Sequence, residues 1–191
     1  MTPKIHTLPT LLLGLLLSGC GHLPFGASPA TPATGLAVTE ISAAPEGCGP
    51  QPTVTAIPRL RLPGTESPRV KASTDKSLDL AQVHTVNRPL QEAGVWADVE
   101  GGWSVLSLEL GSTGARTLAV RLREASLPER SEIWLCSLDR SVRQGPYREV
   151  TDGELWTPVV PGSEALIQVW LPTNRKGAFR ALLADAYGGY R

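Results

Sequence analysis

From Lys71 onward, apolar and polar residues alternate in short runs that Gly, Pro, Asn and Asp interrupt. This alternation is typical of strands that bury one side and expose the other. The runs lie around residues 78–83, 95–99, 106–110, 118–122, 132–138, 155–160, 165–171 and 179–184. Short strands at such intervals are characteristic of sandwiches and barrels. We therefore predict an all-β domain, a two-sheet, jelly-roll-like β-sandwich.

Two segments have more specific signatures. Gly101-Gly102 separates two alternating runs and predicts a hairpin turn, because glycine readily adopts the positive φ that tight hairpins require. Leu155 to Val160 is compact and apolar, but Pro158 within it lacks the N–H that a central strand donates. We therefore place this segment at a sheet edge or a bend.

The first part of the chain has a different composition. Eleven of the 17 prolines fall by Pro68, and residues 1–58 contain only three charged side chains. Such a sequence buries too little apolar surface to offset the entropy of ordering it. We therefore predict a flexible tether over residues 20–69 and the folded domain over residues 70–191. An alternative for the end of the tether is an edge strand containing Val54, Ile57, Leu60 and Leu62.

Residues 1–19 have the features of a signal peptide. Lys4 precedes an apolar run from Leu11 to Leu17. A membrane-spanning helix needs roughly 20 apolar residues, so this run is too short to be a permanent anchor. The segment is therefore predicted to direct export.

The segment Leu17-Ser18-Gly19-Cys20 follows the apolar run and resembles the bacterial lipoprotein box. The resemblance implies that Cys20 is acylated and becomes the new N-terminus, which would attach the mature chain to a lipid bilayer. Gly21 in the next position favours the outer membrane of a Gram-negative envelope, facing the periplasm or the cell surface. The alternative is an ordinary secretory signal in which Cys20 is incidental.

Charge and composition exclude several classes of protein. The chain of 191 residues has 18 basic and 18 acidic side chains, so it has no net charge that would attract nucleic acid. Its 19 glycines and 17 prolines disfavour a helical bundle or coiled coil. We therefore expect no nucleic-acid partner.

The cysteines allow two interpretations. After acylation of Cys20, Cys48 and Cys136 remain in an oxidising compartment, where they are candidates for a disulfide. Alternation instead places Cys136 on the side of Trp134, where it would suit a small buried apolar residue. Two distant cysteines without clustered histidines do not make a zinc site, so we predict no metal and no cofactor.

The sequence has no recognisable catalytic arrangement. After removal of the signal, His22 and His84 remain, and His22 lies in the predicted tether. A Ser-His-Asp triad would therefore need His84, which sits in a strand-like stretch. The chain also lacks a Gly-x-Ser-x-Gly elbow, a phosphate-binding glycine loop and a two-histidine metal motif. We therefore predict that the protein is not an enzyme.

Charged and aromatic residues in the middle of the chain provide a candidate partner surface. Five tryptophans lie in the folded half, where a row of exposed ones would suit sugar stacking and buried ones would serve packing. Arginines of the middle strands form either a solvated face or a docking surface for a carboxylate-bearing partner. The candidate partner surface consists of Trp156, Asp152, Glu154, Arg121 and Arg123. Asp152 and Glu154 flank Gly153, which also suits a simple turn.

Several short segments together resemble a known domain. They are Gly101-Gly102-Trp103, Ser126-Leu127-Pro128-Glu129, Gly145-Pro146-Tyr147, the segment from Gly153 to Ala165, and the final Tyr187-Gly188-Gly189-Tyr190-Arg191. This set is similar to the N-terminal non-catalytic domain of bacterial secreted trypsin-like serine endopeptidases of the lysyl-endopeptidase type. The similarity covers residues 90–191 and implies an accessory domain that docks a protease or holds a secreted substrate. No catalytic residue of that family has a counterpart here.

The predicted function is therefore a lipid-anchored, non-enzymatic binding or accessory module of the cell envelope. Its partners would be the bilayer, through acylated Cys20, and a secreted trypsin-like protease or an envelope protein. One alternative is a detached pro-domain that chaperones or inhibits such a protease, or a truncated protease relic. A second alternative is a carbohydrate-binding module.

Overall fold

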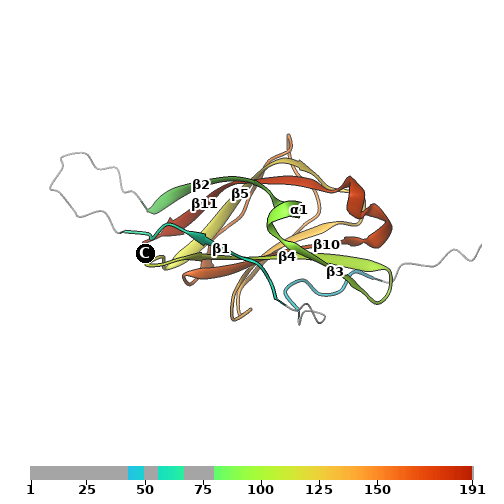
Figure 1. Ribbon diagram of the computed structural model, residues 1–191, viewed down its shortest axis with the longest axis horizontal. Helices are drawn as coiled ribbons and strands as arrows, with labels where there is room; N and C mark the ends of the chain where they lie inside the picture. Colours follow the sequence, from blue (N-terminus) through green and yellow to red (C-terminus); the bar gives the residue numbers. More distant parts are fainter. Residues whose placement is uncertain (1–42, 50–55, 67–79, 191) are drawn as a thin grey trace, which may run out of the picture. The chain divides into compact units, whose positions relative to one another are not determined.

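The computed structural model describes residues 43–49, 56–66 and 80–190 (Figure 1). Its strands are β1 (Arg59–Leu62), β2 (Ala81–Pro89), β3 (Val95–Val99), β4 (Trp103–Ser112), β5 (Thr117–Ser126), β6 (Glu132–Ser137), β7 (Arg143–Tyr147), β8 (Leu155–Trp156), β9 (Val160–Pro161), β10 (Glu164–Pro172) and β11 (Arg180–Gly189). Two short helices, α1 (Leu90–Ala93) and the 3₁₀ helix η1 (Thr173–Ala178), join strands. The predicted signal peptide and Cys20 lie outside the described residues.

The strands form two sheets that pack face to face (Figure 1). Sheet A has the order β1-β4-β10-β6-β7, with β3 also paired to β4, and sheet B has the order β2-β11-β5-β8, with β9 also paired to β5. The jelly-roll order becomes visible when eight strands are renumbered one to eight in chain order: β2, β4, β5, β6, β7, the β8/β9 pair, β10 and β11. In these numbers sheet B reads 1-8-3-6 and sheet A reads 2-7-4-5. This is the strand order of a jelly roll. The predicted all-β, two-sheet sandwich is confirmed.

The core lies between the sheets and is built from the alternating apolar positions. Leu106, Leu108 and Leu110 of β4 are fully buried, and so are Leu118, Val120 and Leu122 of β5. Full burial of one such side chain contributes about 1.5–3 kcal/mol relative to leaving it exposed. The alternation in the sequence therefore identifies the inner face of each sheet.

The predicted turn and edge features are also confirmed. β3 and β4 form an antiparallel hairpin around Gly101 and Gly102, whose φ angles are 79° and 78°. β8 and β9 pair with β5 on either side of Pro158, at the edge of sheet B. There the side chain of Thr157 extends the pairing, since its Oγ1 accepts a hydrogen bond from the backbone N–H of Val120 at 2.9 Å.

The sandwich begins earlier in the chain than the predicted boundary at residue 70. β1 pairs in parallel with residues 109–112 of β4, and its Leu60 and Leu62 pack against the core. The backbone N–H of Glu109 also donates to the carbonyl of Pro58 at 2.9 Å. Because β4 has an unfilled edge beyond its hairpin with β3, a short apolar segment from the proline-rich region completes the sheet there.

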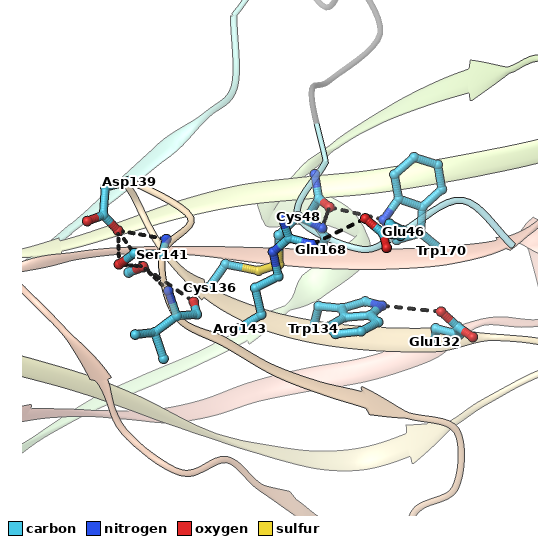
Figure 2. Close-up of a disulfide and its surroundings, with 12 residues drawn as sticks. Glu46, Cys48, Glu132, Trp134, Cys136, Asp139, Ser141, Arg143, Gln168 and Trp170 are labelled. Carbon is cyan, nitrogen blue, oxygen red and sulfur yellow. Dashed lines mark hydrogen bonds and ion pairs between the residues drawn. A yellow bond between two sulfur atoms is a disulfide. The ribbon is translucent and has the colours of Figure 1, made fainter.

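A second early segment, residues 43–49, lies on the outer face of sheet A and is here called the strap (Figure 2). A disulfide joins Cys48 of the strap to Cys136 of β6, and both cysteines are fully buried. The side-chain Oε1 of buried Gln168 accepts hydrogen bonds from the backbone N–H of Cys48 at 2.7 Å and from Nε1 of Trp170 at 3.0 Å. The strap thus belongs to the folded body.

Candidate functional site

The register of sheet B creates one row of polar and aromatic side chains across four strands. Trp156 of β8 lies opposite Arg121 of β5, which in turn lies opposite Asp185 of β11, and Asp185 lies opposite Thr85 of β2. The neighbouring positions in these strands are buried in the core, so this row points to the outside of the sandwich. Side chains from distant parts of the chain are therefore held side by side.

Trp156 is the aromatic residue of this row, with 54% of its surface accessible. The Trp156 ring packs against the Tyr187 ring at a centroid separation of 5.5 Å and an interplanar angle of 35°. The guanidinium carbon of Arg121 lies 4.6 Å from the centroid of the Trp156 ring. Cation–π contact at an exposed site contributes about 0.5–1 kcal/mol. The large indole is therefore presented to solvent in one supported orientation.

Ion pairs surround this aromatic pair. Nη2 of Arg121 donates to both carboxylate oxygens of Glu154, at 2.8 and 3.0 Å. Arg123 lies 3.5 Å from the same carboxylate, and Asp185 lies 3.7 Å from Nη1 of Arg121. The indole Nε1 of Trp156 donates to Glu154 at 3.3 Å. We call these residues, Arg121, Arg123, Glu154, Trp156, Asp185 and Tyr187, the Trp156 face.

The contacts within the Trp156 face shift the pKa values of Glu154, Arg121 and Tyr187. The hydrogen bond from Arg121 lowers the pKa of Glu154, and the same hydrogen bond raises the pKa of Arg121. Partial burial raises the pKa of the Tyr187 hydroxyl. At neutral pH, two positive and two negative side chains thus balance one another across the face.

Four of the five residues predicted as a partner surface come together in this arrangement, namely Arg121, Arg123, Glu154 and Trp156. Asp152 sits in the adjoining turn, with a φ of 51°, and among the described residues no ion pair links it to the two arginines. In the same turn the carbonyl of Gly153 accepts the N–H of Ala125 at 2.9 Å. Asp152 therefore lies beside the ion-pair cluster, in the turn that leads to Glu154.

Sequence reasoning missed Tyr187 and Asp185. They alternate with buried Ala184 and Ala186, so the pattern places them on the outer side of a strand. Their position beside Arg121 depends on the pairing of β11 with β5, which alternation does not reveal.

The tryptophans divide between packing and exposure. Trp103 and Trp170 are buried on the outer face of sheet A near the strap, whereas Trp96 and Trp134 are half-buried. The Trp96 ring makes an edge contact with Phe179 at a centroid separation of 6.1 Å. Only Trp156 of the five is exposed, so the tryptophans do not form an exposed row.

His84 points into the sandwich and is 5% exposed. Its Nε2 lies 3.3 Å from Oγ1 of Thr65, which lies 2.7 Å from Oγ of Ser112. Burial lowers the pKa of the His84 ring. In residues 43–49, 56–66 and 80–190 no carboxylate hydrogen-bonds to this ring, and no group of three or more His, Cys, Asp or Glu side chains is arranged to hold a metal ion.

Comparison with models of known protein families and with curated proteins finds no match for this chain. Within the described part of the chain, no helix has the length and apolar character needed to cross a membrane.

Proposed function

We propose that this protein is a non-enzymatic binding or accessory module of the cell envelope, and that it docks a protein partner through the Trp156 face. The observation that carries the proposal is the exposed indole of Trp156, held between Tyr187 and Arg121. Trp, Tyr and Arg are the residue types most enriched at the energetic centres of protein interfaces. Here all three meet on one exposed sheet face.

The Trp156 face is also organised before any partner arrives. Glu154 accepts two hydrogen bonds from Arg121 and one from Trp156, which restricts the rotamers of both side chains. Immobilising a rotamer-rich side chain on binding costs about 0.5–1.5 kcal/mol, so side chains that are already restrained lose less. A partner would therefore meet an aromatic centre with a polar rim.

A protein partner suits this chemistry better than a glycan. Sugar-binding faces offer aromatic rings for stacking, but Arg121 and Tyr187 already pack against the Trp156 ring. The other four tryptophans are buried or half-buried, so they add no further platform. A protein partner can instead contact the ring edges of these residues and use their hydrogen bonds and charges.

The envelope location in this proposal rests on the lipoprotein box at Leu17-Ser18-Gly19-Cys20. Two or more acyl chains on Cys20 would give a lasting membrane attachment, since each buried methylene contributes about 0.8 kcal/mol. The residues between Cys20 and the strap would then set how far the sandwich reaches from the bilayer. The partner would be an envelope protein or a secreted protease of the trypsin-like class.

The proposal is tested by site-specific photo-crosslinking of the full chain in its natural host. A photoreactive residue at Val159, which is exposed and close in sequence to Trp156, is expected to form a defined adduct with one protein. Introducing Trp156→Ala into the same chain should abolish that adduct. The matched control places the photoreactive residue at exposed Arg175 in η1 and should give no such adduct. An adduct that persists unchanged with Trp156→Ala would refute the role of the face.

A further inference from the structure

A groove of about 420 Å³ is lined by residues of β1 and β2. The two strands, one from each sheet, are labelled in Figure 1. The volume of the groove lies within the range of roughly 300–1,000 Å³ that is usual for ligand sites. Both strands are sheet edges, since among the described residues β1 pairs with β4 and β2 pairs with β11, and neither has a second strand partner. The groove is therefore bordered by two open strand edges.

The walls of the groove combine apolar and basic side chains. Half-buried Leu60, Leu62 and Val86 contribute apolar surface, and exposed Arg61 and Arg88 add two positive charges. No Asp or Glu is among the lining residues, which also include Pro63, Gln82, Val83, His84 and Thr85. The lining residues thus carry two positive charges and no negative charge beside an apolar surface.

This imbalance contrasts with other arginines on the sandwich. Arg59 pairs with Glu109 and Glu164 at 2.8 and 2.6 Å, and Arg148 pairs with Glu132 at 2.7 Å. Within the described part of the chain, neither Arg61 nor Arg88 has an ion-pair partner. A carboxylate is the group that the guanidinium geometry recognises best, together with phosphate.

One end of the groove is closed by the residues that follow β1. The backbone N–H of Thr65 donates at 2.7 Å to the carbonyl of Thr113, in the turn that follows β4 of sheet A, while its Oγ1 contacts Nε2 of His84 in sheet B. The backbone N–H of Glu66 donates to the side chain of Gln82 at 3.2 Å. A bound molecule would therefore extend along the strands, away from this closed end.

The open edge of β2 provides backbone hydrogen-bonding groups along the groove. The N–H of Tyr190 donates to the carbonyl of Leu80 at 3.1 Å, which sets the antiparallel alternation between β2 and β11. In that alternation, the backbone groups of Val83 and Thr85 face away from β11. An exposed strand edge of this kind can accept an added strand from another chain.

We propose that this groove binds an extended, acidic peptide segment of a partner protein. The peptide backbone adds to the open edge of β2, and Asp or Glu side chains of the peptide meet Arg61 and Arg88. None of the residues of the Trp156 face lines the groove, and the two surfaces meet only where Thr85 of the groove donates a hydrogen bond to Asp185 of the face at 3.3 Å. Main-chain pairing supplies affinity, and the arginines supply selection for acidic sequences.

The binding test uses two blocked, fluorescein-labelled hexapeptides, one alternating valine with aspartate and one alternating valine with asparagine. Fluorescence anisotropy with the full chain is expected to show binding of the aspartate peptide and at least fivefold weaker binding of the asparagine peptide. Arg61→Gln and Arg88→Gln should each weaken binding of the aspartate peptide about two- to fivefold, as expected for exposed ion pairs. Arg175→Gln is the matched control, since Arg175 is an exposed arginine of η1, and it should leave binding unchanged.

A second measurement locates the peptide and separates this proposal from the function of the Trp156 face. Hydrogen exchange of the full chain should show peptide-dependent protection within residues 81–86, and Trp156→Ala should not alter it. Equal binding of both peptides, or binding of neither at millimolar concentration, would overturn the proposal. Binding that emerges only after residues 67–79 are replaced by a Gly-Ser linker would overturn it as well, since the chain itself would then be the occupant.

Discussion

Removing the Cys48–Cys136 disulfide is expected to destabilise the sandwich strongly. The two cysteines are separated by 88 residues in the sequence. In the chain-entropy description, closing a loop of that length lowers the entropy of the unfolded chain enough to stabilise the fold by about 4.6 kcal/mol at 25 °C. Dividing this loss of free energy by the entropy of unfolding, about 2.1 cal/mol/K per folded residue, gives a melting temperature that is lower by roughly 15 °C.

The assay compares the double variant Cys48→Ala/Cys136→Ala with the parent in urea unfolding. Both chains carry Cys20→Ala, so that no third thiol can exchange with the disulfide. Tryptophan fluorescence reports on the strap directly, because Trp134 and Trp170 lie beside it on the outer face of sheet A (Figure 2). Trp103 packs in the same cluster as Ala44 of the strap. The matched control is the parent protein that has been unfolded, reduced and refolded in the presence of the reductant. It lacks the disulfide and should behave like the double variant.

One result would refute this reasoning. A loss below about 1 kcal/mol would mean that the unfolded chain is not restrained by the crosslink as the entropy description requires. A large loss without any change in the native fluorescence spectrum would agree with that description and would show in addition that the strap keeps its place without the disulfide. In that case the hydrogen bond from the Cys48 N–H to Gln168 and the packing of the strap would suffice to hold it.

Four further predictions concern single residues. Gly47→Ala should lower stability by about 1–3 kcal/mol in urea unfolding, because a Cβ there would overlap the Trp134 ring. Gly177→Ala is the control and should be nearly neutral, because nothing lies within 4 Å of the added Cβ. Thr157→Val should cost about 1–3 kcal/mol because it leaves the N–H of Val120 without its side-chain acceptor, and Thr85→Val on the exposed side of β2 is the control, expected to change stability by less than about 0.5 kcal/mol. Burial lowers the pKa of His84 in the folded state, so the stability that His84 contributes should be complete above its unfolded pKa of about 6.5 and decline as the pH falls below that value. His84→Gln should therefore make the free energy of unfolding depend less on pH between pH 7.5 and 5. An unchanged pH dependence in the variant would contradict a lowered pKa for His84. Mass spectrometry of the mature protein should find acyl chains on an N-terminal Cys20 and Cys20→Ala should release the protein from membranes, whereas an unmodified Cys20 within an intact chain would rule out the anchor.

The sequence alone predicted four of the six residues of the Trp156 face and missed the other two. Arg121, Arg123, Glu154 and Trp156 were recognisable because outward-facing arginines and an apolar edge segment are local features. Tyr187 and Asp185 come from β11, more than sixty positions from Arg121 along the chain, and join the face only through the pairing of β11 with β5. The groove was not predictable at all, because it depends on two strand edges that belong to different sheets.

The sequence alone determined the local conformation of this protein. Alternating apolar residues specified most of the strands and the side of each that is buried, although β7 and the second half of β2 were not among the predicted runs. The glycine pair and Pro158 specified a turn and an edge. These features follow from backbone sterics and from the period of the side chains, both of which act between neighbouring residues.

Only the tertiary structure decided which strands are neighbours, that residues 43–49 and 59–62 join the sandwich, and that Cys48 meets Cys136. Those choices depend on how two sheets bury their faces together, since an apolar strand face or a buried cysteine can be satisfied by many partners at any distance along the chain. For the same reason, the placement of Trp156, Tyr187 and Arg121 on one surface is a property of the whole fold rather than of any one segment.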